Sequence, residues 1–248
     1  MSTTPSTSRD RLIVALDFDR IAPALALARR LASSVGMFKI GAQLFTAEGP
    51  RAVEQVASLG RGIFLDLKFH DIPNTVAGAV RAAAGLPGVR MINVHALGGY
   101  SMMAASIRAV SDVRPKPLLL AVTLLTSMDE SELDRVGIRG IPETRVIHLA
   151  RLARMAGLDG VVASARELRA LRRLRGKRLT IVVPGVRPKA TAWRDQSRVA
   201  TPAEAIRDGA DYLVIGRPIT EARDPLAAAN AILKEIAGAA RRRSPRRA

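Results

Sequence analysis

The chain has 248 residues, a formal net charge of +17 and no cysteine. This length suits one large α/β domain, and the low aromatic content of 3% predicts a core built from Ala, Leu, Val and Ile. The absence of cysteine excludes a disulfide scaffold, a thiol nucleophile and a Cys-ligated metal. With only His70, His95 and His148 as imidazoles, we expect no metal site.

The hydropathy of the chain gives no sign of a membrane partner. No apolar run approaches the roughly 20 residues needed to cross a bilayer. The first residues, MSTTPSTSRDR, are polar and lack the apolar segment of a secretory signal. We therefore expect a soluble, cytoplasmic protein.

The positive charge raises the question of nucleic-acid binding. Five arginines lie in the last eight residues, RRRSPRRA, and the others are scattered along predicted helices without interleaved aromatic residues. Solvated helix faces and a disordered tail explain this pattern better than a nucleic-acid interface, so we expect no nucleic-acid partner. A positive field would also suit a small anionic substrate.

Short β-branched runs alternate along the chain with segments rich in Ala, Leu and Arg that have helical periodicity. The strand-like runs are 12–17, 37–41, 62–68, 91–96, 117–126, 160–164, 179–187 and 212–218. Eight strand–helix pairs predict a single-domain (β/α)₈ TIM barrel. A doubly wound open sheet is the alternative, but no Gly-rich phosphate fingerprint follows the first run.

No linker divides the chain. We expect a disordered N-terminal segment at 1–10, the barrel at 11–238 and an arginine-rich disordered tail at 239–248. The segments DIPNT (71–75) and TPAEA (201–205) carry signals of a helix start.

Polar residues recur where the predicted strands end, and this edge carries the active site of such barrels. They are Asp17, Lys39, Asp66, Lys68, Asp71, Asn93, His95, Thr126, Ser127, Arg187, Gly216 and Arg217. Asp66 and Lys68 are two residues apart, so we expect both on one side of the strand, with Lys39 extending them into an alternating array. A salt bridge that only tethers a strand end is the structural alternative. It accounts poorly for five charged residues at one barrel mouth.

The end of the chain predicts a phosphate site. VIGRPIT (214–220) places a glycine and an arginine after the last strand, and the loops after strands seven and eight commonly bind phosphate. The segment 187–200, RPKATAWRDQSRVA, has the length and polarity of a lid, an ordinary long loop being the alternative.

Several fragments together resemble the orotidine 5′-phosphate decarboxylase family. They are DLKFHDIPNT (66–75), ALD (15–17), FKIG (38–41), LTS (125–127), PGVR (184–187), DQ (195–196) and GRPIT (216–220). The resemblance runs from about Arg11 to Gly238. Val186 and Pro218 stand where the family commonly has Ile and Ser, and neither change removes a functional side chain.

The resemblance implies decarboxylation of orotidine 5′-monophosphate to UMP and CO₂, the last step of de novo pyrimidine synthesis, without cofactor or metal. It implies that Lys68 protonates C6, that Asp66 and Asp71 flank this lysine, and that Lys39 completes the charged network.

The resemblance also implies a homodimer with active sites at the interface, in which Asp71, Ile72 and Thr75 reach the partner's site. The implied substrate-binding residues are Asp17, Lys39, Asp66, Ile72, Thr75, Thr126, Ser127, Pro184, Arg187, Gln196, Gly216 and Arg217. Of these, Asp17 and Lys39 would bind ribose, Thr126 and Ser127 would lie against the sugar and the pyrimidine, and Arg187, Gln196, Gly216 and Arg217 would hold the phosphate. His95 matches a family position but receives no chemical role.

A second barrel family remains as an alternative. The 3-keto-gulonate- and hexulose-phosphate enzymes also carry Asp-x-Lys on the third strand, but act on open-chain sugar phosphates, generally with magnesium. The DIPNT continuation, LTS and DQ favour the nucleotide enzyme.

Overall fold

Eight parallel strands close into a barrel in chain order in the computed structural model, which describes residues 5–188 and 200–243. The strands are β1 (Leu12–Ala15), β2 (Met37–Gly41), β3 (Gly62–Phe69), β4 (Val89–His95), β5 (Leu118–Val122), β6 (Gly160–Val162), β7 (Thr180–Pro184) and β8 (Tyr212–Ile215). Strand β8 pairs with β1, which closes the ring. The predicted (β/α)₈ fold is confirmed.

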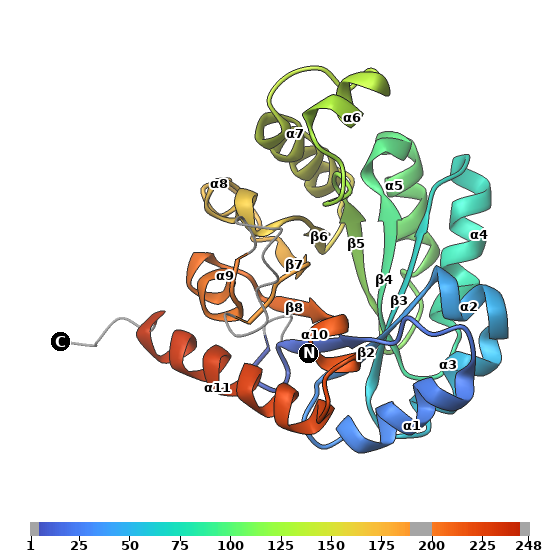
Figure 1. The fold of residues 1–248 in the computed structure, drawn as a ribbon. Coiled ribbons are helices and arrows are strands. Elements are labelled where there is room, and N and C mark those ends of the chain that lie inside the picture. The colour runs from blue at the N-terminus through green and yellow to red at the C-terminus, as the bar shows by residue number, and fades with distance from the viewer. Residues whose placement is uncertain (1–4, 189–199, 244–248) are drawn as a thin grey trace.

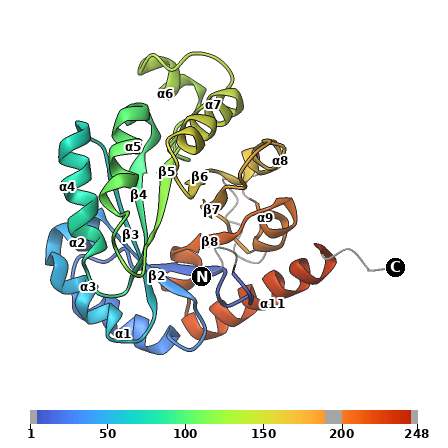
Figure 2. The same cartoon turned by 180° about the vertical axis from the view of Figure 1, so that it is seen from behind.

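Helices follow the strands and surround the barrel (Figure 1). They are α1 (Ile21–Leu31), α2 (Ala42–Glu48), α3 (Pro50–Ala57), α4 (Pro73–Ala84), α5 (Gly99–Ala109), α6 (Glu130–Arg135), α7 (Pro142–Met155), α8 (Leu168–Arg172), α9 (Pro202–Asp208), α10 (Arg217–Thr220) and α11 (Pro225–Arg243), with short 3₁₀ turns at Ala96–Gly98 and Ala165–Glu167. Helices α4 and α5 lie side by side in both views (Figures 1 and 2). No helix in the described ranges is long and apolar enough to cross a membrane.

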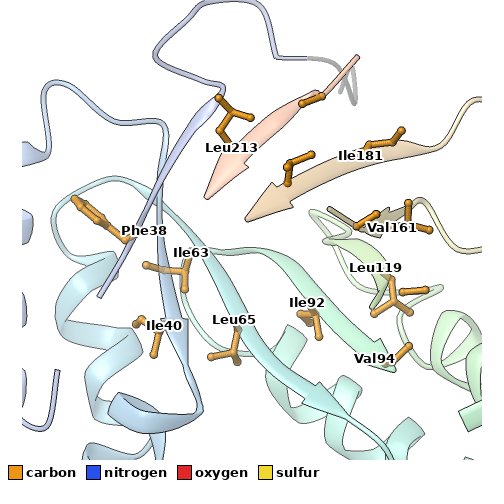
Figure 3. Packing of buried hydrophobic residues seen from close by; sticks show 14 of the residues in the cluster. Phe38, Ile40, Ile63, Leu65, Ile92, Val94, Leu119, Val161, Ile181 and Leu213 are labelled. Atoms are coloured by element: carbon orange, nitrogen blue, oxygen red, sulfur yellow. The ribbon is translucent and has the colours of Figure 1, made fainter. Parts of the chain in front are cut away.

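The strand residues divide into two buried sets, because successive side chains on a strand point to opposite faces. The inner set includes Ile13, Phe64 and Met91, and it packs within the barrel. The outer set packs between the strands and the helices, and Figure 3 labels several of its members, Phe38 and Ile40 among them. Lys39, Asp66 and Asn93 occupy inward positions of the same alternation, so the barrel carries polar groups inside at one end.

Three strands end at least three residues earlier than predicted. Strands β5, β7 and β8 end at Val122, Pro184 and Ile215, whereas the apolar runs continue to 126, 187 and 218. The runs are misleading because loop residues beyond the strands are also buried: Leu124 is 8% exposed and Val186 is 2% exposed. Hydrophobicity reports burial, and burial here continues past the hydrogen-bonded ladder.

Helix α9 begins as predicted from TPAEA. Thr201 accepts the backbone N–H of Glu204, and the Glu204 carboxylate accepts the N–H of Thr201, which is a complete capping box. Helix α11 extends past the expected barrel end at 238 to Arg243, because Ala239 is buried against the core and continues the apolar face. At the other end, Asp10 accepts hydrogen bonds from Ser6 and Thr7 within a turn. The rest of the predicted terminal segments lies outside the described residues.

A buried carboxylate holds the base of the barrel together, at the end opposite the polar mouth. The Asp211 side chain, only 2% exposed, pairs with Arg172 at 2.6 Å and with Arg178 at 2.6 Å. It also accepts the backbone N–H of Ile181 at 2.9 Å. Asp211 therefore joins α8, β7 and the start of β8.

We predict that Asp211→Ala lowers the free energy of unfolding by about 3–5 kcal/mol, because it removes the carboxylate that neutralises the largely buried Arg172 guanidinium and accepts the Ile181 N–H. Urea-induced unfolding measures this loss. The control is Asp208→Ala, which removes a more exposed pair with Arg169 and is expected to cost less than about 1 kcal/mol. Equal losses of unfolding free energy in the two variants would show that the buried network stabilises the fold no more than the exposed ion pair does.

Candidate active site

A buried carboxylate, Asp66, lies at the centre of the polar mouth. Its Oδ1 is 2.7 Å from Lys68 Nζ, and its Oδ2 is 3.3 Å from Lys39 Nζ. The side chains of Asp66 and Lys39 are 11% and 10% exposed, whereas that of Lys68 is 39% exposed. The carboxylate is thus shared by one enclosed lysine and one lysine that remains open to the mouth.

Asp17 extends this arrangement to the first strand. Lys39 Nζ is 2.9 Å from Asp17 Oδ1, and the Asp17 side chain is 52% exposed. The four predicted residues therefore form one alternating row, Asp17–Lys39–Asp66–Lys68, from the residues just after β1 across β2 to β3. Alternation of sign lets each interior charge face an opposite charge on both sides, which reduces the cost of burial.

Gly41 leaves the space in which this row is packed. A Cβ at position 41 would lie 2.8 Å from Lys39 Nζ and 3.4 Å from Asp17 Oδ1. Any side chain here would displace the ammonium group. The FKIG fragment pointed to Lys39, but the steric reason for the glycine appears only in the folded barrel.

Strand β3 is irregular where it carries the two charged residues. Its pairing with β4 shifts between Leu65 and Phe69, and Lys68 has a φ of 50°, in the left-handed region. Simple alternation along a regular strand therefore does not explain why Asp66 and Lys68 meet. The contact is made, but from a bulged backbone that residue spacing alone did not predict.

Asn93 of β4 contacts both members of the pair. Its Nδ2 donates to Asp66 Oδ1 at 2.6 Å, and its Oδ1 accepts the backbone N–H of Lys68 at 2.8 Å. The side chain is fully buried. Sequence reasoning placed Asn93 at a strand end without a role; its inward position in the apolar run MINVHA was the available signal.

Asp71, Ile72 and Thr75 do not join the row of charges. Asp71 Oδ1 accepts the N–H of Ile72 at 2.6 Å, and no ion pair of Asp71 is found among the described residues. All three side chains are exposed where the chain leaves β3 and enters α4, and Ile72 is 66% exposed.

The other predicted residues lie at the ends of later strands. Thr126 and Ser127 form an exposed turn after β5, and Pro184 is the last residue of β7. Arg187 is half-buried, and its backbone N–H donates to Ala200 O at 3.1 Å. Gln196 and the expected lid around it lie outside the described residues.

Gly216 and Arg217 connect β8 to α10 beside the row of charges. A Cβ at Gly216 would lie 3.9 Å from Asp17 Oδ2 and 3.5 Å from the Cβ of Ala15. Arg217 follows as the first residue of α10 and is exposed. The strand ends β8 and β1 therefore place an arginine and an aspartate at neighbouring points of the mouth.

A stacked pair of histidines adjoins Lys68. The rings of His70 and His95 lie 5.2 Å apart and nearly parallel, at 18°. His95 Nδ1 is buried and has no hydrogen-bond partner among the described residues. Burial, followed by the nearby His70 and Lys68, lowers the pKa of His95 below its usual 6.5. His95 is therefore neutral at pH 7.

We predict that His95 makes stability depend on pH. Because its folded pKa is lowered, the unfolded chain binds a proton near pH 6.5 that the folded chain does not bind. Stability should therefore fall as pH decreases below 6.5, until the folded pKa is reached. Urea unfolding from pH 5 to 7.5 should show a weaker fall for His95→Gln, and an unchanged slope would contradict the assignment. NMR checks the folded-state pKa directly. The imidazole resonance that is present in the wild type and absent from His95→Gln belongs to His95, and its titration should show a pKa below 6.5.

No cluster of three or more potential metal ligands is found within residues 5–188 and 200–243. A (β/α)₈ barrel with a row of paired charges at the carboxyl ends of its strands defines an enzyme-like scaffold, since this edge carries the active site in such barrels.

Comparison with known proteins identifies the family. Residues 10–232 match the model of the orotidine 5′-phosphate decarboxylase / HUMPS family, so the chain belongs to this family. The family resemblance found in the sequence motifs is confirmed. The predicted enzyme class, a carboxy-lyase, is confirmed by the relatives, which are named orotidine 5′-phosphate decarboxylase.

Relatives cover nearly the whole chain. Orotidine 5′-phosphate decarboxylase of Halorhodospira halophila is 53% identical, over 92% of this chain and 97% of the relative. The protein of the same name from Teredinibacter turnerae is 51% identical, over 93% and 99%. Among solved structures, orotidine 5′-phosphate decarboxylase from Lactobacillus acidophilus is 37% identical, with a TM-score of 0.76 over 91% of this chain and 98% of that one.

Proposed function

We propose that this chain decarboxylates orotidine 5′-monophosphate to UMP and CO₂, the last step of de novo pyrimidine synthesis. The observation that carries the proposal is the row Asp17–Lys39–Asp66–Lys68, which holds a partly exposed ammonium group in a barrel mouth. Relatives about 50% identical over nearly their full length are named for this activity.

The chemistry requires a fixed positive charge beside C6 of the pyrimidine. When the bond between C6 and the carboxylate breaks, the electron pair stays on C6 in an orbital that no adjacent carbonyl can stabilise. Lys68 Nζ, held by Asp66, stabilises this charge and then gives its proton to C6 while CO₂ departs. The charges are already paired and positioned before reaction, which avoids a reorganisation cost.

The ribose and phosphate fit the neighbouring strand ends. Asp17 is half-exposed and already oriented by Lys39, so both can bind ribose hydroxyls. Gly216 and Arg217 lie next to Asp17, and Arg187 lies beyond β7; the two guanidinium groups suit a phosphate dianion. In this proposal Gln196 also contacts the phosphate.

The remaining residues complete the pyrimidine pocket. Thr126 and Ser127 present exposed hydroxyl groups after β5, and Pro184 closes the end of β7. Phosphate and ribose contacts far from C6 supply binding energy that organises the reacting end, so truncated substrates should lose rate as well as affinity.

Exposed apolar residues at the mouth support a homodimer. Ile72, Leu97 and Tyr100 are 66%, 44% and 49% exposed and follow β3 and β4. Covering them with a second copy would remove apolar surface from water. It would also bring Asp71 and Thr75 towards the partner's site, in keeping with the lack of an ion pair between Asp71 and its own Lys68 in the described structure.

The deciding experiment measures orotidine 5′-monophosphate decarboxylation by the chelator-treated protein. We expect full activity with chelator and, in Lys68→Ala, a loss of kcat of at least about 10³-fold with UMP binding retained. The control is Lys116→Ala, at an exposed lysine just before the start of β5, the strand end opposite the mouth. Full activity of Lys68→Ala would overturn the mechanism; turnover of sugar phosphates only, with magnesium, would favour the alternative family.

A mixing experiment tests the shared site. Lys68→Ala and Asp71→Ala homodimers should each be nearly inactive. When subunits are exchanged, the mixed dimer contains one site with a native Lys68 and a native Asp71, so activity should return, towards about a quarter of the wild-type level in a random mixture. A mixture that forms mixed dimers but stays inactive would place Asp71 and Lys68 in the same subunit's site.

A further inference from the structure

The bulge in β3 leaves Lys68 in need of an unusual support. Leu65 pairs with Ile92 and Phe69 pairs with Val94, so residues 66–68 of β3 face the single residue Asn93 of β4. A bulge removes ladder hydrogen bonds where it occurs. Lys68 lies in this bulge with a φ of 50°, a conformation that side chains other than glycine rarely adopt.

The Asn93 amide replaces the missing ladder partner. Its Oδ1 accepts the Lys68 backbone N–H at 2.8 Å, a donor that would otherwise be left without a partner beside the barrel interior. Its Nδ2 donates at 2.6 Å to Asp66 Oδ1, the oxygen that lies 2.7 Å from Lys68 Nζ. The contacts form a closed ring that fixes Lys68 at both ends, backbone and ammonium.

The ring needs an amide of this length. One atom must accept an N–H while its neighbour donates to a carboxylate, and asparagine offers an acceptor oxygen and a donor nitrogen on the same carbon. Aspartate at 93 would put a second carboxylate against Asp66, and alanine would leave both contacts unmade.

We propose that Asn93 is a positioning residue for the reaction: it holds the left-handed backbone of Lys68 and orients the Asp66 carboxylate that aims the ammonium group. This inference rests on the proposed role of Lys68. Asn93 acts through Lys68 and Asp66: among the described residues, its side chain forms hydrogen bonds with these two and none with Asp17, Arg187 or Arg217.

The expected signature is a split between kcat and KM. Removing the Asn93 amide should misplace Lys68 Nζ while the ribose and phosphate groups keep their binding positions. An error of about 1 Å in a reacting group costs on the order of 10²-fold in rate. Asn93→Ala should therefore lose about 10²-fold or more in kcat, with KM and UMP affinity within about threefold of wild type.

Two further variants make the test specific. Asn93→Asp keeps the size and the acceptor for the Lys68 N–H but loses the donor to Asp66, so it should lose at least as much kcat as Asn93→Ala. Thr123→Val is the control, because Thr123 is also fully buried at this end of the barrel and its hydroxyl donates only to Val162 O at 3.0 Å. Thr123→Val should lower stability and leave kcat within about threefold.

Each result of these experiments either supports or overturns the proposed role of Asn93. A kcat near wild type in either Asn93 variant overturns the proposal, and so does a parallel loss of kcat and UMP affinity, which would indicate a merely structural role. A crystal structure of Asn93→Ala supplies a readout independent of substrate: we expect Lys68 to leave the left-handed region and Nζ to move from Asp66. An unmoved Lys68 would contradict the inference, whereas an inactive wild-type protein would contradict only the proposed function.

Discussion

The Asp66 carboxylate is the interaction on which the rest of the site depends. It lies in the barrel mouth almost out of contact with water, where an unpaired charge would cost several kcal/mol. Its Oδ2 contacts Lys39, and its Oδ1 contacts Lys68 and Asn93. Strands β2, β3 and β4 therefore converge on one carboxylate. The carboxylate therefore has all its partners only when these three strands are paired.

The two ends of the barrel use a buried carboxylate for different purposes. At the base, Asp211 is surrounded by Arg172, Arg178 and a backbone N–H, and Arg172 also donates to carbonyl groups of Gly209 and Leu179. At the mouth, Asp66 holds Lys68, whose side chain remains 39% exposed. The first arrangement satisfies its charges within the fold. The second leaves an ammonium group partly exposed at the mouth, where a ligand can reach it.

The sequence predicted the fold well because the barrel pattern is local. Each apolar run produced a strand, and TPAEA produced a capped helix at Thr201. The ends of β5, β7 and β8 were overestimated because Leu124 and Val186 remain buried beyond the ladder. The DLKFHDIPNT segment located the charged pair for a similar reason: charges at the end of an apolar strand are costly unless they are paired or used.

Residue types and their order thus sufficed for the barrel, for the mouth as the polar end, and for Asp17, Lys39, Asp66 and Lys68 as its charged residues. The tertiary structure decided how they meet. The shift of β3 against β4, the left-handed Lys68 and the two contacts of Asn93 depend on pairing between segments 25–27 residues apart. No local pattern encodes that register, since it depends on how β3 and β4 pair within the closed barrel.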